Sequence, residues 1–166
     1  MNQKNTKREE LFDRGMAQNL IKEAFEARKT AYAPYSGFYV GAALLTQVGG
    51  VYHGCNIENA AYGDSCCAER TAFFKAVSEG HRSFRGIAIV GGKKLERCSY
   101  SEKKPEGEPL QETVGTYAFP CGSCWQVMSE FCNPEFVVIV AKSIEDYQIY
   151  QLKELIPFSF DRELLS

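Results

Sequence analysis

The chain has 166 residues, a length typical of one compact domain with a sizeable core. Its net charge of −2 and its scattered Lys and Arg residues give no basic stripe, which argues against a nucleic-acid polymer as partner. The seven cysteines are an odd number, and no stretch resembles a secretion signal or a membrane span, so we expect a cytoplasmic protein that uses cysteines for metal rather than for disulfides.

The N-terminal residues 1–14 are highly charged, and we expect a lead-in of which residues 8–14 could begin the first helix. Residues 15–166 are then expected to form a single domain. From Met16, apolar residues recur at helical spacing, and this helix must end before Pro34 because the residue before a proline disfavours helical geometry.

The remaining pattern alternates strands with helices. Glycines 49 and 50 separate two extended segments and predict a β-hairpin. Two short runs are continuously apolar, which is typical of central strands buried on both faces. The order indicates a layered α/β domain, with strands expected at 38–46, 51–55, 86–90, 136–141 and 147–150, and helices at 67–79, 121–131 and 152–156.

Residues 92–118 interrupt this order with a stretch rich in Lys, Glu, Ser, Gly and Pro. We expect a long surface insert, either a solvated loop or a lid or partner contact.

Three cysteines have spacings suited to one metal ion. Cys121 and Cys124 lie three residues apart at the start of a predicted helix, whose N-terminus stabilises thiolates. Together with Cys67 they provide three ligands, the number that a catalytic zinc takes from protein while its fourth position holds water. Glu69 follows Cys67 by two residues and is placed to transfer protons beside that water without binding the metal.

A closed structural zinc site is the alternative, and it requires a fourth ligand. None of the candidates has the spacing of a second ligand pair; they are Cys55, Cys66, Cys98, Cys132, His53 and His81.

The flanking residues extend the pattern. The chain resembles the small, all-cysteine type of cytidine deaminase through the runs YSGFYVGAAL (35–44), GCNIENAAYG (54–63), CAERTAFFKA (67–76), PCGSC (120–124) and LIPFSF (155–160). The resemblance implies a three-layer α/β/α fold with a mixed five-stranded sheet. It also implies one Zn²⁺ per subunit and a hydrolase that converts cytidine and deoxycytidine into uridine and deoxyuridine plus ammonia.

The resemblance assigns further residues to the substrate. Glu69 is implied as the catalytic proton carrier, Asn56 and Glu58 as partners of the sugar 3′-hydroxyl, Phe38 as an aromatic contact of the pyrimidine, and Ala68 as a further substrate-binding residue. Alternate residues of an extended segment face the same side, which agrees with Asn56 and Glu58 reaching one ligand. Phe38 alone could equally be a core residue.

Arg70 matches an arginine that donates to the zinc-ligand sulfurs in the family, which would offset the −1 charge of three thiolates on Zn²⁺. A surface arginine in a solvent-exposed ion pair is the alternative.

The resemblance further implies a homotetramer in which Ala60, Tyr62 and Phe160 reach a neighbouring subunit's pocket. Two residues depart from the family pattern. Trp125 stands where an arginine is usual, and Phe119 replaces a small polar residue, so an interface contact and the pocket wall are expected to differ.

Three alternatives remain open from the sequence. A deaminase of an aminonucleoside such as blasticidin S could use the same zinc core, but the intact GCNIENAAYG run favours a simple nucleoside. A polynucleotide deaminase should show basic and aromatic channels, which the chain lacks. An inactive zinc-binding nucleoside sensor would not need Glu69.

Overall fold

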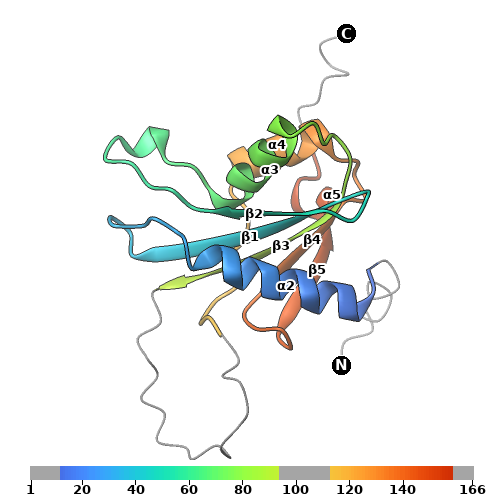
Figure 1. Ribbon diagram of the computed structural model, residues 1–166, viewed down its shortest axis with the longest axis horizontal. Coiled ribbons are helices and arrows are strands. Elements are labelled where there is room, and N and C mark those ends of the chain that lie inside the picture. The colour runs from blue at the N-terminus through green and yellow to red at the C-terminus, as the bar shows by residue number, and fades with distance from the viewer. Residues whose placement is uncertain (1–11, 94–112, 159–166) are drawn as a thin grey trace, which may run out of the picture.

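The computed structural model describes residues 12–93 and 113–158 of the chain (Figure 1). In chain order, its elements are α2 (Arg14–Arg28), β1 (Phe38–Thr46), β2 (Val51–Cys55), the short 3₁₀ helix η1 (Tyr62–Asp64), α3 (Ala68–Ser78), β3 (Phe84–Lys93), α4 (Gly122–Phe131), β4 (Val137–Ala141), β5 (Tyr147–Gln151) and α5 (Leu152–Leu155).

The five strands form one mixed sheet in the order β2-β1-β3-β4-β5. The β3–β4 pair is parallel, and the other three pairs are antiparallel. Helix α2 covers one face, while α3, α4 and α5 cover the other (Figure 1). The expected three-layer α/β/α fold is therefore confirmed.

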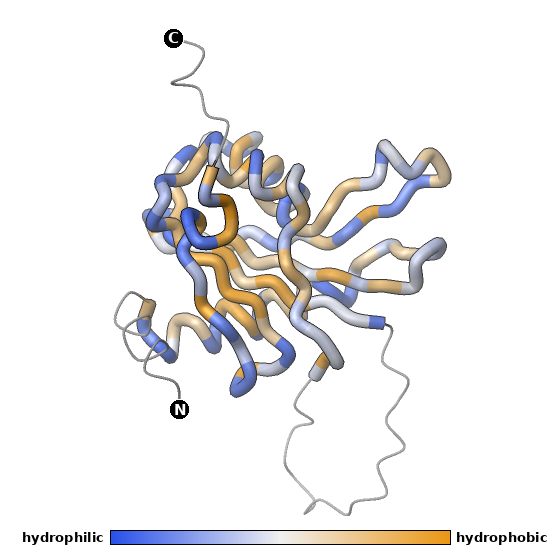
Figure 2. The backbone as a smooth tube through the Cα atoms, turned by 180° about the vertical axis from the view of Figure 1, so that it is seen from behind, coloured by the Kyte–Doolittle hydropathy of each residue, from blue (hydrophilic) through white to orange (hydrophobic). Residues whose placement is uncertain are grey.

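Each face of the sheet has its own hydrophobic core. One core packs α2 residues such as Ile21 against β3 and β4, and the other packs Phe73 of α3 and Met128 of α4 against the opposite face. Strands β3 and β4 occupy internal positions, as their continuously apolar runs predicted. Figure 2 shows this hydrophobic character gathered in the central strands.

Helix α2 begins at Arg14, inside the stretch 8–14 that we expected could begin the first helix. The Asp13 side chain accepts a hydrogen bond from the Met16 backbone N–H at 3.0 Å and so caps the helix. Phe12, which we placed in the charged lead-in, is 2% exposed and packs in the α2 core. The fold thus extends into the end of that stretch.

Two glycines allow the helices to lie directly on the hairpin. A Cβ atom at Gly54 of β2 would lie 2.1 Å from the backbone oxygen of Ala68, the first residue of α3. A Cβ atom at Gly41 of β1 would lie 2.1 Å from the Ala24 oxygen of α2. The N-terminus of α3 is consequently held against β2, and this contact fixes the position of Cys67.

The described parts of the insert are its two ends. Strand β3 continues to Lys93, so residues 92 and 93 belong to the sheet, while residues 94–112 lie outside the described residues. On return, the Val114 N–H donates to the Lys142 oxygen at 2.8 Å, and the Tyr117 hydroxyl donates to Asp146. Both contacts attach the returning chain to the turn between β4 and β5.

No helix in the described ranges is long and apolar enough to cross a membrane.

Candidate active site

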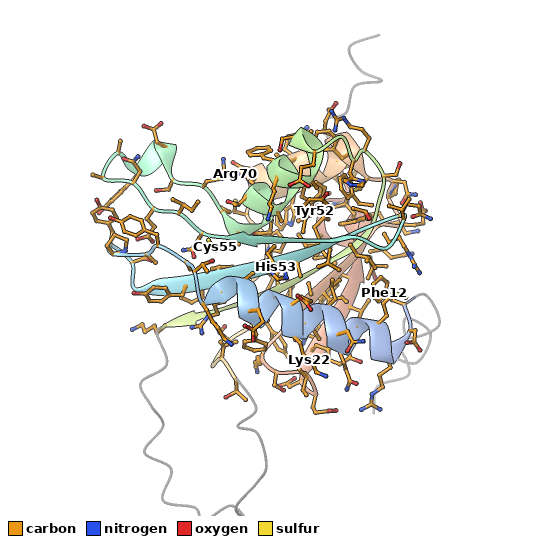
Figure 3. The ribbon with its side chains drawn as sticks, viewed as in Figure 1. Phe12, Lys22, Tyr52, His53, Cys55 and Arg70 are labelled. Atoms are coloured by element: carbon orange, nitrogen blue, oxygen red, sulfur yellow. The ribbon has the colours of Figure 1, made fainter. Side chains whose placement is uncertain are left out.

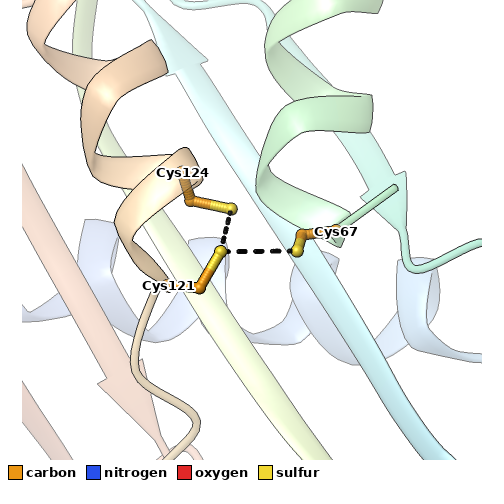
Figure 4. A group of neighbouring side chains, drawn as sticks. All are labelled: Cys67, Cys121 and Cys124. Atoms are coloured by element: carbon orange, nitrogen blue, oxygen red, sulfur yellow. Dashed lines mark hydrogen bonds between the residues drawn. The ribbon is translucent and has the colours of Figure 1, made fainter. Parts of the chain in front are cut away.

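The three predicted cysteines lie together where α3 and α4 begin (Figure 4). Cys67 is the N-cap of α3, Cys121 is the N-cap of α4, and Cys124 lies in the first turn of α4. The Cys121 sulfur is 3.7 Å from that of Cys67 and 3.5 Å from that of Cys124. Segments more than fifty positions apart in the sequence therefore supply one thiol cluster.

The separations suit zinc. All three sulfurs lie within 4.8 Å of one another, and tetrahedral ligands at a Zn–S distance of about 2.3 Å are roughly 3.8 Å apart. Hydrogen bonding from Cys124 lowers the pKa of Cys67 to about 5. The same interaction, together with burial, raises the pKa of Cys124, so metal binding has to displace a proton there.

The other candidate ligands do not join this group in the described part of the chain. His53 and Cys55 lie on β2 (Figure 3), where the His53 Nε2 atom is 2.6 Å from a Glu23 carboxylate oxygen and the Cys55 thiol points to the Thr30 carbonyl. Cys98 lies outside the described residues. The donor set among the described residues is thus the three-cysteine set that leaves one tetrahedral position open.

Glu69 lies beside the cluster in the first turn of α3 and is 4% exposed. Burial raises the pKa of its carboxyl to about 7. Thiolate charge on Cys67 acts in the same direction, while Cys124 and Arg70 oppose it. A carboxyl group with this pKa can both accept and donate a proton near neutral pH.

Arg70 approaches the cluster through one nitrogen. Its Nη2 atom donates to the Ser65 carbonyl at 2.8 Å and lies 3.9 Å from the Cys67 sulfur. Its Nε atom is buried without a hydrogen-bond partner among the described residues. Arg70 is therefore a partly buried cation next to a thiolate and not a solvent-exposed surface residue.

Asn56 lies beside β1, and both ends of its side-chain amide contact that strand. The Oδ1 atom accepts from the Val40 N–H at 2.8 Å, and Nδ2 donates to the Phe38 carbonyl at 2.8 Å. One N–H of Nδ2 and one lone pair of Oδ1 remain for a ligand. Asn56 thereby continues the pairing of β2 with β1 beyond the last residue of β2.

Glu58 contacts the turn that precedes β1. One carboxylate oxygen, Oε2, accepts from the Tyr35 N–H at 2.9 Å and the Ser36 N–H at 3.2 Å. The other, Oε1, accepts from the Ser36 hydroxyl. The sequence indicated Glu58 but not Ser36, since no spacing rule connects residues 22 positions apart.

A short bridge connects this region to the metal centre. Ile57 and Cys66 exchange two backbone hydrogen bonds, each of 2.9 Å. Because Ile57 lies between Asn56 and Glu58, and Cys66 precedes Cys67, the predicted sugar contacts are fixed relative to the first thiol. Ala68 is fully buried at the start of α3.

Phe38 begins β1 and is half-buried. Its Cε1 atom is 3.0 Å from the place where a Cβ atom on Gly91 would lie, so the absence of a side chain there makes room for the ring.

The structure describes two of the three residues expected to reach another subunit. Ala60 and Tyr62 lie in the exposed arm between β2 and α3, and Tyr62 is 75% exposed. Its ring contacts that of Tyr35, with 5.8 Å between the centroids. Phe160 lies outside the described residues.

The two departures from the family pattern both lie next to ligand cysteines in the sequence, Trp125 directly after Cys124 and Phe119 two residues before Cys121. The Trp125 indole nitrogen is buried and has no hydrogen-bond partner in the described ranges. Phe119 is 48% exposed, and its ring centroid is 5.6 Å from that of Tyr150. A half-exposed aromatic ring therefore stands two residues before Cys121.

Residues 15–140 match the family profile described as the cytidine and deoxycytidylate deaminase zinc-binding region. A cytidine deaminase of Sporosarcina psychrophila is 44% identical over 149 residues, which is 90% of this chain and 94% of the relative. One of Halalkalibacterium halodurans is 44% identical over 146 residues, with coverage of 88% and 95%. The crystal structure of cytidine deaminase from Burkholderia pseudomallei superposes with a TM-score of 0.70 at 40% identity, covering 86% of this chain and 97% of that one.

Proposed function

Because the chain belongs to the cytidine and deoxycytidylate deaminase family, we infer that it hydrolyses cytidine and deoxycytidine to uridine and deoxyuridine with release of ammonia. The observation that carries this inference is a three-cysteine cluster with Glu69 buried beside it and outside the ligand group. Zinc is the cofactor. When bound, it supplies the nucleophile by lowering the pKa of a water molecule to about 7.

The chain's own residues divide the remaining work. Cys67, Cys121 and Cys124 would hold the zinc, with Arg70 offsetting part of the thiolate charge. Glu69 would take one proton from the attacking water and deliver it to ring N3. It would then take the second proton from the same oxygen, now bonded to C4, and give it to the departing amino group, so that ammonia leaves and the C4 carbonyl of uridine remains. Its pKa of about 7 supports a carboxyl that changes protonation state during turnover.

Substrate recognition is assigned to four further residues. Phe38 and Ala68 would contact the pyrimidine, and Asn56 and Glu58 the 3′-hydroxyl of the sugar. The remaining lone pair on Oε1 of Glu58 and the free N–H of Asn56 support this assignment, because a hydroxyl needs one acceptor and can take one donor.

The proposed assembly is a homotetramer in which Ala60, Tyr62 and Phe160 complete a neighbouring pocket. The exposed aromatic pair of Tyr35 and Tyr62 supports it, because large exposed aromatic side chains that lie together are typical of an interface. A cytoplasmic location is proposed because the metal-binding thiols must stay reduced.

The deciding experiment incubates the purified zinc-loaded chain with cytidine, deoxycytidine and blasticidin S and identifies the products. We expect uridine and deoxyuridine. Deamination of blasticidin S alone would overturn the proposal in favour of the aminonucleoside reading, and no product from any of the three would support an inactive sensor.

A further inference from the structure

The hydroxyl group of Ser36 lies between two groups that the proposed function assigns to the substrate. It donates to Oε1 of Glu58 and accepts from the backbone N–H of Phe38 at 3.0 Å. A serine hydroxyl has one proton. Since the N–H of Phe38 can only donate, the Ser36 proton is directed to Glu58.

The carboxylate of Glu58 is consequently held in one orientation. Oε2 accepts two backbone N–H groups, whereas Oε1 accepts only the Ser36 hydroxyl. With two lone pairs on each oxygen, the unused acceptor site is on Oε1. A hydroxyl of a ligand would therefore find its acceptor at Oε1, next to the Ser36 proton.

Removing the hydroxyl would loosen this arrangement. The two bonds to Oε2 come from adjacent residues and hold only that oxygen, so without the Ser36 bond the carboxylate can pivot about Oε2 and Oε1 loses its fixed position. The hydrogen bond from Ser36 is also the largest of the influences that hold the pKa of Glu58 below its usual value. Both effects would act at the oxygen that faces the substrate.

We propose that Ser36 is a positioning residue that orients Glu58 Oε1 toward the 3′-hydroxyl of the nucleoside sugar. The proposal rests on the proposed function and adds a residue to its sugar-recognition site.

The test compares two substrates that differ by one hydroxyl. Values of kcat/KM are measured for cytidine and 3′-deoxycytidine with the wild type and Ser36→Ala; if turnover of 3′-deoxycytidine is too slow, its inhibition constant against cytidine replaces it. Ser36→Ala should lower kcat/KM for cytidine about tenfold, the usual size of one hydrogen bond to a charged group. The loss for 3′-deoxycytidine should stay below about threefold, because the hydroxyl that Glu58 would bind is missing.

Two single variants and one double variant separate this role from a merely structural one. Ser36→Thr keeps the hydroxyl and should stay within about threefold of the wild type on cytidine. Ser78→Ala removes a comparable serine hydrogen bond, to the Lys75 carbonyl in the last turn of α3. It should leave kcat/KM for both substrates unchanged. In a Glu58→Gln background, adding Ser36→Ala should lower kcat/KM for cytidine by a further factor of less than about three.

The contrary results are equally specific. Equal losses of kcat/KM on both substrates in Ser36→Ala would mean that Ser36 acts through Phe38 and not through Glu58. No loss on either substrate would also overturn the proposal. So would a loss in the Glu58→Gln background as large as the loss in the wild-type background. If the wild type deaminates cytidine and any of these contrary results is obtained, only the positioning role of Ser36 is refuted. A wild type without cytidine deamination refutes the proposed function and the positioning role together.

Discussion

Replacing Gly54 with alanine tests whether the close packing of α3 on β2 determines the metal centre. The added Cβ atom would lie 2.1 Å from the Ala68 oxygen and 2.4 Å from the Ala72 nitrogen. Both are backbone atoms of α3, so no side-chain rotation relieves the contact. Either β2 or the start of α3, which positions Cys67, has to move.

The displacement can be judged from the distances. Ordinary contact begins at 3.4 Å, so the oxygen contact is too short by more than 1 Å. Overpacking of a tight core costs about 1–3 kcal/mol and sometimes more, and a backbone obstacle places Gly54→Ala at about 3 kcal/mol. At about 2–4 °C per kcal/mol for a chain of this size, the midpoint of thermal unfolding should fall by about 6–12 °C.

The assay combines thermal unfolding with the zinc content of the purified protein. Gly115→Ala is the matched control, because a Cβ atom there meets nothing within 4 Å. We expect Gly54→Ala to melt lower and to retain less zinc, and Gly115→Ala to match the wild type. If Gly54→Ala keeps one zinc per chain and melts within about 1 °C of the control, the packing of α3 on β2 does not position Cys67.

Four further predictions concern the site. The purified chain should contain about one zinc per subunit and lose activity on chelation, whereas full activity without zinc would remove the mechanism. Glu69→Gln should keep zinc and fold but abolish deamination, since its carboxyl carries protons and does not bind metal; turnover by this variant would refute that role. Glu58→Gln should lower kcat/KM for cytidine at least about tenfold, and free cytosine should be a poor substrate for the wild type. Mixed oligomers of Glu69→Gln and Phe160→Ala should exceed the mean activity of the two variants reassembled separately, and activity no higher than that mean would exclude Phe160 from a neighbour's pocket.

The secondary structure was predicted from local sequence patterns. The predicted bounds are accurate where an element's own residues determine where it begins and ends. Strands β1 and β2 have the predicted bounds, with Gly49 in the turn at φ 95°, a geometry that glycine adopts without strain. Strand β3 is longer than its apolar run because residues 91–93 are paired by β1, where the partner of Lys93 is Phe38. That extension comes from another strand, and no feature of residues 91–93 themselves encodes it.

The chemistry of the site was also readable from the chain. The spacing of Cys121 and Cys124 reflects one turn of a helix, Cys67 provided the third thiol, and the position of Glu69 two residues after Cys67 indicated the proton carrier. Tertiary structure alone decided how these groups meet. The burial that raises the pKa of Glu69 depends on the layers around α3, and the approach of Cys67 to Cys121 depends on α3 and α4 packing on the same face of the sheet.

The sugar-recognition region shows the same division. The sequence by itself determined that Asn56 and Glu58 face the same side, because they lie two residues apart on an extended segment. It did not determine what they contact in the folded chain. The Ser36–Glu58 and Asn56–Phe38 hydrogen bonds join residues 22 and 18 positions apart, and they form only because β1 pairs with β2 and brings the preceding turn beside residue 58. Side-chain identity is local information, whereas hydrogen-bond partners across strands are a consequence of chain packing.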